Sequence, residues 1–168
     1  MRVLALSVAV LLSGGAAIAA DPAPEITRPA STPQANGVLH TVRQIPEACS
    51  RLEGTFTGTA AAPYTLNVVR TSATCQPRAR FVDAATAKPD VTSGWKLNDV
   101  IRIPSAMCPA QQAVVRVWRK PVEQAVALDG EGQSRIYLAD AKKDAAAARA
   151  VPLPQFAQVM TVEGKACK

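Results

Sequence analysis

The clearest pattern of hydrophobic and polar positions lies in residues 112–120, where side chain character alternates with a period of two. One side of the pattern holds Ala113, Val115 and Val117, and the other holds Val114, Arg116, Trp118 and Lys120. A period of two is typical of a β-strand whose faces meet different surroundings. The small apolar side predicts a place in a core. The side with a guanidinium beside an indole is a candidate binding surface.

Comparable short segments, rich in threonine, valine and aromatic residues, run along the rest of the chain between turn residues. Strands are predicted at 38–45, 52–59, 64–71, 78–83, 95–104, 112–120, 122–128, 134–138 and 156–162. Segment 84–94 is predicted to be a loop, and the alanine-rich segment 140–150 predicts one short helix. This pattern predicts a mainly β fold: an antiparallel β-sandwich or small barrel with one short C-terminal helix at about 140–150.

Segment 95–104 contains one irregularity. Its apolar positions, Trp95, Leu97, Ile101 and Ile103, are predicted to share a core-facing side. Asp99 falls on that same side, where an unpaired carboxylate is costly to bury. We therefore expect an edge or a β-bulge near Asp99.

The N-terminus has the order of features of a secretory signal peptide: Arg2, an apolar run and a small-residue exit. We assign 1–20 to the signal, 21–37 to a proline-rich leader and 38–168 to a single disulfide-bonded β domain. An exported protein, periplasmic or secreted, follows, with no transmembrane segment after the signal peptide. The four prolines of the leader favour a flexible spacer. The alternative is an arm that docks on a partner or on the domain itself.

The cysteines number four, and all follow the predicted signal peptide. An even number in an exported chain predicts two disulfides. If Thr59 lies opposite Tyr64 in a hairpin, Cys49 meets Cys75 at its open end, which makes Cys49–Cys75 and Cys108–Cys167 the preferred pairs. The nested pairs Cys75–Cys108 and Cys49–Cys167 remain open. The cysteine spacing predicts no metal site, and no motif calls for a cofactor.

Catalytic motifs are scarce. The single histidine, His40, is next to the leader, where a histidine of a catalytic triad is poorly held. The carboxylates Glu53, Asp83, Asp99 and Glu123 are not brought together by any spacing. These observations favour a protein that is not an enzyme, although a site of arginine, lysine and tyrosine would escape such a search.

Arginine recurs within the predicted strands at positions that alternate with apolar neighbours, namely Arg70, Arg80, Arg102, Arg116 and Arg135. Arginine binds carboxylate and phosphate through two parallel hydrogen bonds and stacks on aromatic rings. The candidate ligand-binding residues are Arg80, Arg102, Arg116, Trp118, Arg135 and Tyr137. With a formal charge of +6, they predict a binding module for an acidic ligand or partner: an acidic polysaccharide, an envelope component or a protein.

The plain alternative is that outward arginines belong to any sheet in water, which the pattern favours slightly. Trp118 weakens that alternative, because an indole on a polar face needs a cover, which segment 140–150 or the leader would supply. Segment 105–110 suggests another function. A loop stapled at Cys108 and stiffened by Pro109 suits an inhibitor of a secreted protease or other enzyme, although an ordinary stapled loop is the more common meaning.

Overall fold

The computed structural model describes residues 21–122, 153–165 and 167. The predicted signal peptide, the hairpin strands 122–128 (beyond Val122) and 134–138, and the helix 140–150 lie outside the described residues. So do three of the candidate side chains, Glu123, Arg135 and Tyr137.

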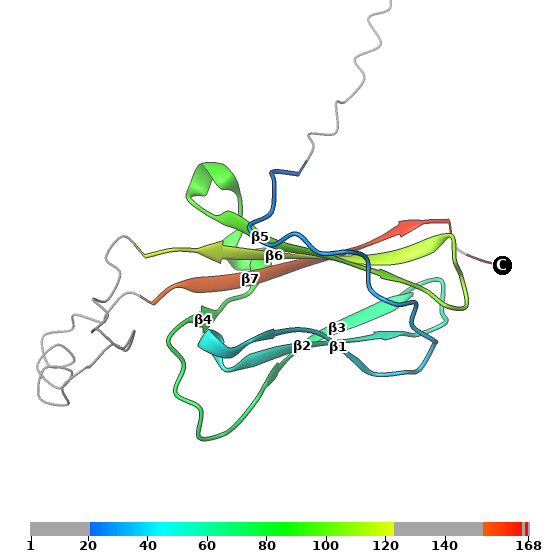
Figure 1. Cartoon of the computed structure of the whole chain (residues 1–168), viewed down its shortest axis with the longest axis horizontal. Coiled ribbons are helices and arrows are strands. Elements are labelled where there is room, and N and C mark those ends of the chain that lie inside the picture. The colour runs from blue at the N-terminus through cyan, green and yellow to red at the C-terminus, as the bar shows by residue number, and fades with distance from the viewer. Residues whose placement is uncertain (1–20, 123–152, 166, 168) are drawn as a thin grey trace, which may run out of the picture.

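The described strands form two sheets that face each other (Figure 1). The three-stranded sheet has the order β1-β2-β3, with β1 (His40–Ile45), β2 (Ser50–Phe56) and β3 (Tyr64–Arg70). The four-stranded sheet has the order β4-β7-β6-β5, with β4 (Arg80–Phe81), β5 (Lys96–Pro104), β6 (Gln111–Lys120) and β7 (Gln155–Gly164). Among the pairs of described strands, β4 with β7 is parallel and the others are antiparallel. The predicted mainly β fold is confirmed as two facing sheets that do not close into a barrel.

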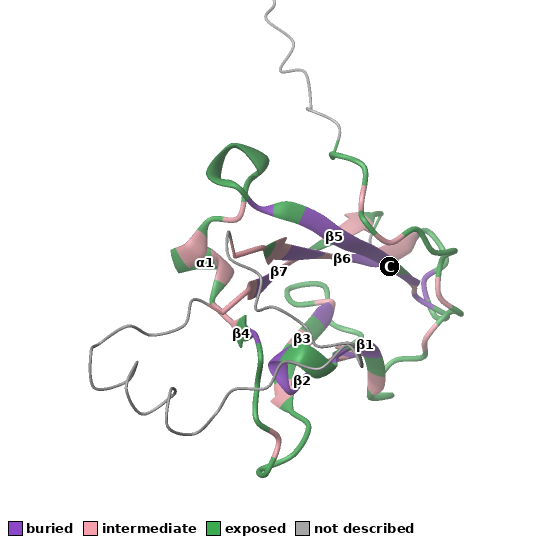
Figure 2. Ribbon diagram, turned by 60° about the vertical axis from the view of Figure 1, so that its left-hand side comes forward, coloured by how far each residue is buried: buried purple, intermediate pink, exposed green. Residues whose placement is uncertain are grey.

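The main core lies between the sheets, where buried residues of both layers meet (Figure 2). The three-stranded sheet contributes Ile45, Leu52 and Phe56. On β6, the predicted core side is confirmed, because Ala113, Val115 and Val117 are all fully buried.

A second apolar cluster covers the opposite side of the four-stranded sheet, which we call its outer face. It contains Trp95, Leu97, Val100, Val114, Trp118 and Ala157. The short helix α1 (Ala84–Ala87) packs over it through Ala84 and Ala87. The prediction that 84–94 is a loop is therefore wrong in part, since it holds α1 and the 3₁₀ turn η2 (Val91–Ser93). Asp83 and Asp90 cap these two turns by accepting a backbone N–H.

A β-bulge interrupts β5 beside Asp99, as predicted. Leu97 lies opposite Trp118, but the next paired residue, Asp99, lies opposite Val117. The extra residue reverses the alternation of faces. The prediction that Trp95 and Leu97 share a face with Ile101 and Ile103 is therefore wrong: the first two belong to the outer cluster and the last two to the main core.

Both preferred disulfides form: Cys49–Cys75 and Cys108–Cys167, with Cα atoms 5.9 and 5.7 Å apart. The register used to predict the first was wrong, since Tyr64 lies opposite Phe56 rather than Thr59. Cys49 follows the 3₁₀ turn η1 (Pro46–Ala48), and its carbonyl oxygen accepts from the N–H of Thr71. The chain after Arg70 then turns back, because the Arg70 guanidinium donates to the carbonyl oxygens of Ser72, Ala73 and Cys75.

The leader lies along the edge of β5. Backbone N–H groups of Glu25, Ile26, Ser31 and Gln34 donate to β5 carbonyl oxygens, each at 2.9 Å. The leader then crosses to the other sheet, where the N–H of Gly37 donates to the carbonyl oxygen of Phe56 at 2.8 Å. The sequence favours a free spacer, but residues 25–37 have the docked arrangement that was its alternative.

Candidate functional site

The structure separates most of the candidate arginines. Arg102 and Arg116 lie diagonally across β5 and β6 on the outer face, about 7–8 Å apart at Cα. Arg80 lies at the far edge of the same sheet. It is separated from Arg102 by about 14 Å across the strands, which is three strand spacings, and also by about 20 Å along the strands. Arg70 belongs to the other sheet, where it holds a turn.

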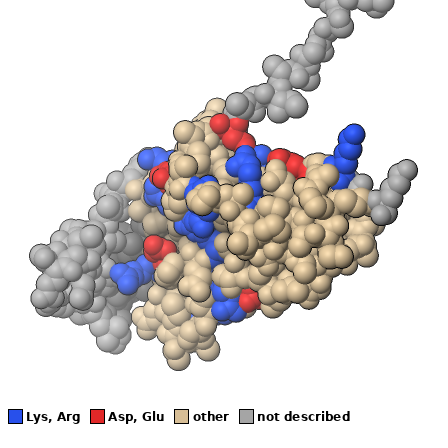
Figure 3. Space-filling model, turned by 45° about the vertical axis from the view of Figure 1, so that its right-hand side comes forward, with Lys and Arg blue, Asp and Glu red and all other residues tan. Residues whose placement is uncertain are grey.

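The Arg116 guanidinium is already engaged. It donates to Asp21 at 2.7 Å, to Thr161 at 3.1 Å and to Glu163 at 3.4 Å. Arg102 is exposed and forms no ion pair with a described residue. Trp118 is only 8% exposed and packs in the outer cluster, against which Ala84 and Ala87 of α1 also pack. Segment 140–150, one of the two covers expected for Trp118, lies outside the described residues. In Figure 3, basic and acidic side chains are interspersed instead of forming one continuous basic surface.

The candidate carboxylates do not converge. Glu53 pairs with Arg51 in β2, and Asp83 caps α1. Asp99 is fully buried and accepts from Arg28 of the leader, at 3.0 and 2.6 Å, and from Arg43 of β1.

The cluster around Asp99 fastens the leader to both sheets. Beside it, Asn98 accepts from Arg43 and donates to Glu25 of the leader. Arg119 binds both oxygens of Glu25, at 3.0 and 2.5 Å. These hydrogen bonds lower the pKa of Glu25, against the opposing effect of burial, and raise the pKa of Arg119. We assign the cluster a structural role, because each carboxylate oxygen faces a guanidinium.

His40 is not a free surface residue. Its Nε2 lies 2.9 Å from the hydroxyl oxygen of Tyr64. The Tyr64 side chain reaches it by passing over Gly54 of β2, the strand between β1 and β3. Its Nδ1 lies 3.2 Å from the carbonyl oxygen of Val38. Burial raises the pKa of Tyr64. Both imidazole nitrogens thus have a partner that positions the ring, and neither partner is an acid of the kind that orients a catalytic histidine.

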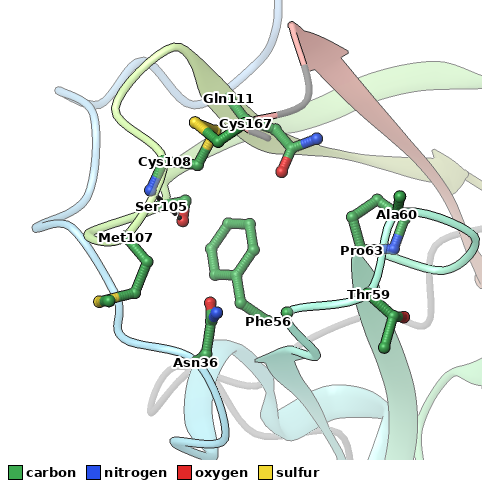
Figure 4. A pocket seen from close by; sticks show the side chains of 11 residues that line it. Asn36, Phe56, Thr59, Ala60, Pro63, Ser105, Met107, Cys108, Gln111 and Cys167 are labelled. Atoms are coloured by element: carbon green, nitrogen blue, oxygen red, sulfur yellow. Dashed lines mark hydrogen bonds between the residues drawn. A yellow bond between two sulfur atoms is a disulfide. The ribbon is translucent and has the colours of Figure 1, made fainter.

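A pocket of about 280 Å³ opens at one end of the sandwich. Its walls come from the leader, the β2–β3 loop, the β5–β6 loop and the C-terminus: Asn36, Phe56, Gly58, Thr59, Ala60, Pro63, Ser105, Met107, Cys108, Gln111 and Cys167. Figure 4 shows the Phe56 ring in the middle of these walls, between Asn36 and the Cys108–Cys167 disulfide. The hydroxyl of Ser105 accepts from the N–H of Cys108 at 3.1 Å, which holds the β5–β6 loop.

None of the described side chains that line this pocket carries a formal charge. The three segments that supply most of them, 29–42, 54–69 and 103–115, contain no Asp, Glu, Lys or Arg, although 19% of the chain is charged. Figure 3, in which this end is turned forward, shows a broad area without charged side chains.

Large apolar side chains are exposed at or next to the pocket. Met107 on its wall is 65% exposed, and Val38 and Leu39, which soon follow Asn36, are 49% and 61% exposed. We call the pocket with these three residues the uncharged end. Sequence reasoning missed it, except for the loop at Met107. The sequence did contain one signal, the three long stretches without charged residues. These stretches indicate a surface only once the fold is known to bring them together.

Comparison with known proteins gives no relative: no family model, no curated protein and no solved structure matches this chain. Within the described ranges, no group of histidine, cysteine and acidic side chains is placed to hold a metal ion. No helix of the described part is long and apolar enough to span a bilayer.

Proposed function

We propose that this protein is an exported binding module whose uncharged end contacts an uncharged segment of a partner protein. One observation carries the proposal: three stretches without charge, far apart in the sequence, meet around one pocket that exposes Met107. The central parts of protein interfaces are depleted of charged residues and enriched in methionine and aromatic side chains.

The uncharged end is also rigid. The Cys108–Cys167 disulfide ties the β5–β6 loop to the C-terminus, and the N–H of Ala106 donates to the leader carbonyl of Gln34 at 2.8 Å. A surface ordered before binding loses less conformational entropy in the complex. Asn36, Thr59 and Gln111 offer hydrogen bonds to a partner backbone, whereas Met107 offers apolar contact.

A protein partner fits better than a carbohydrate. Sugar recognition commonly uses exposed aromatic faces, since an aromatic body is apolar and has a polarised π-face. Here Phe56, Tyr64, Trp95, Trp118 and Phe156 are all buried. The exposed large apolar residues at the uncharged end are aliphatic or methionine.

The test is selection of binding peptides from a displayed random library on the immobilised full chain. We expect the selected peptides to be poor in charged residues, to bind with little dependence on salt and to lose binding to Met107→Glu. Val91→Glu is the matched control, because Val91 is 50% exposed away from the pocket. Selected peptides that are acidic, bind less well at high salt and depend on Arg102 would overturn this proposal in favour of the arginine-bearing outer face.

A second candidate function, inhibition of a secreted protease, is favoured by the exposure of Met107 in a loop fastened on both sides. Ala106 is bonded to the leader, and Cys108 is held by Ser105 and by its disulfide. A panel of serine proteases with apolar specificity pockets tests it. Inhibition is expected to disappear in Met107→Asp and to persist in Met107→Leu. A full panel without inhibition by the unaltered chain would reject this candidate.

A further inference from the structure

The outer edge of β3 differs from the other edges of the two sheets. The leader covers the edge of β5, β4 is only two residues long, and a bulge between Thr41 and Arg43 interrupts β1. By contrast, β3 pairs with β2 in an unbroken register from Tyr64 to Arg70. Its residues from Tyr64 to Val69 carry no charge and include no proline. Long, regular, uncharged edge strands are templates for pairing with another strand.

The hydrogen bonds at both ends of the hairpin show which backbone groups of β3 have no partner among the described residues. The carbonyl oxygen of Pro63 accepts from Thr57 at 3.0 Å, and the N–H of Thr71 donates to Cys49 at 2.9 Å. In an antiparallel pair, bonded and outward-facing residues alternate. The odd-numbered residues of β3 therefore bond to β2. The even-numbered residues, Tyr64, Leu66, Val68 and Arg70, direct their N–H and C=O groups toward the outer edge, where no described strand pairs with β3.

We propose that β3 pairs antiparallel with β3 of a second copy of this chain, about a two-fold axis at Asn67. This register places Leu66 opposite the partner's Val68, and Tyr64 opposite the partner's Arg70. All four outward-facing residues of each strand then meet outward-facing residues of the other. The pairing makes one continuous six-stranded sheet from two three-stranded sheets.

The side chains agree with this register. Leu66 and Val68 lie on the core side of β3, and Val68 is 42% exposed although Leu66 packs against the core. In the dimer, Leu66 of each copy would cover Val68 of the other copy. Cross-strand apolar pairs of this kind stabilise a sheet.

Charge does not oppose the pairing, even though the chain is basic. The only charged residue of β3, Arg70, has its guanidinium bound to carbonyl oxygens of the following turn. The two copies of Arg70 would stand about 20 Å apart, because six residues of strand separate them. At that distance their repulsion is largely screened at physiological salt.

Cysteine cross-linking of the full chain tests the register. At a two-fold axis, Asn67 faces the partner's Asn67 as a non-hydrogen-bonded pair, with Cα atoms about 4.5 Å apart, which is within reach of a disulfide. We expect Asn67→Cys to give a covalent dimer under mild oxidation. Thr65→Cys is the matched control, since the two copies of residue 65 would be about 14 Å apart. No dimer from Asn67→Cys, or equal cross-linking of both variants, would overturn the register.

Sedimentation of the unaltered chain and of edge variants tests the dimer itself. Val68→Pro removes an N–H that faces outward and leaves the bonds to β2, and Val68→Lys places a charge at the interface. Both are expected to raise the dimer dissociation constant about tenfold or more, with an unchanged circular dichroism spectrum. Val91→Lys, at a similarly exposed valine, and Met107→Glu, at the uncharged end, should leave it unchanged. An unaltered chain that stays monomeric, or a dimer insensitive to Val68, would overturn the proposal.

Discussion

Neutralising Asp99 is expected to destabilise the whole fold, although the change from Asp99 to Asn is nearly isosteric. The Asp99 side chain is fully buried at the bulge of β5, and it binds Arg43 of the facing sheet and Arg28 of the leader. After Asp99→Asn, two guanidinium groups face an amide whose N–H₂ group donates instead of accepting.

The expected loss follows from the exposure of the two arginines. Arg43 is only 13% exposed, so its charge stays desolvated, and removing one member of a buried ion pair costs about 3–5 kcal/mol. Arg28 is 36% exposed and returns to water, which limits its share to about 1 kcal/mol or less. A domain of this size is stable by roughly 5–15 kcal/mol, so Asp99→Asn removes a large part of that stability.

Urea unfolding of Asp99→Asn, Arg28→Gln and the double variant Asp99→Asn with Arg43→Gln measures these terms. We expect Asp99→Asn to lower the free energy of unfolding by about 3–5 kcal/mol, and Arg28→Gln by about 1 kcal/mol or less. The double variant should recover part of the loss, because no buried charge is left unpaired. An Asp99→Asn variant as stable as the unaltered chain, or one no less stable than Arg28→Gln, would refute this reasoning.

Three further predictions concern other parts of the molecule. The pKa of Glu25 is lowered in the docked leader, so its contribution to docking is complete above its usual pKa of 4.5 and is lost as pH falls through the lowered pKa. The protection of the Glu25 and Ile26 amides against hydrogen exchange should fall over the same pH range. Glu25→Gln should abolish the pH dependence of this protection. Removing the Cys108–Cys167 disulfide by paired serine substitutions, across a separation of 59 residues, should cost about 4 kcal/mol in urea unfolding, and a loss near zero would contradict its role. In Gly54→Ala, the new Cβ would lie 1.7 Å from the Tyr64 hydroxyl oxygen, so we expect a loss of about 1–3 kcal/mol in the free energy of unfolding and changed NMR chemical shifts of the His40 ring at constant pH; unchanged shifts would count against the His40–Tyr64 bond.

The sequence was most informative where alternation is regular. The core side of β6 followed directly from its period of two, and residue type at Asp99 indicated the bulge. Both disulfides were predicted, but Cys49–Cys75 rested on a register that is wrong by three residues. The longer β2–β3 loop places Thr71 opposite Cys49, and Cys75 still reaches Cys49 because the segment after Arg70 folds back.

Other features needed three-dimensional information. The leader docks through backbone hydrogen bonds and through ion pairs of Asp21, Glu25 and Arg28, and neither kind of contact leaves a hydrophobic period in its sequence. The four-residue helix α1 is too short to show a helical repeat, yet it packs against the outer cluster, in which Trp118, a candidate ligand-binding side chain, is buried. The uncharged end arises from segments 29–42, 54–69 and 103–115 only because the fold brings them together.

The most direct test of the proposed function locates the bound peptide on the molecule. Backbone amide NMR shifts of the isotope-labelled full chain would be followed during titration with a peptide selected from the library. We predict that the largest changes fall at Asn36, Thr59 and Met107, with little change at Arg102 and Arg116. Changes centred on Arg102 and Arg116, with the uncharged end unaffected, would contradict the account.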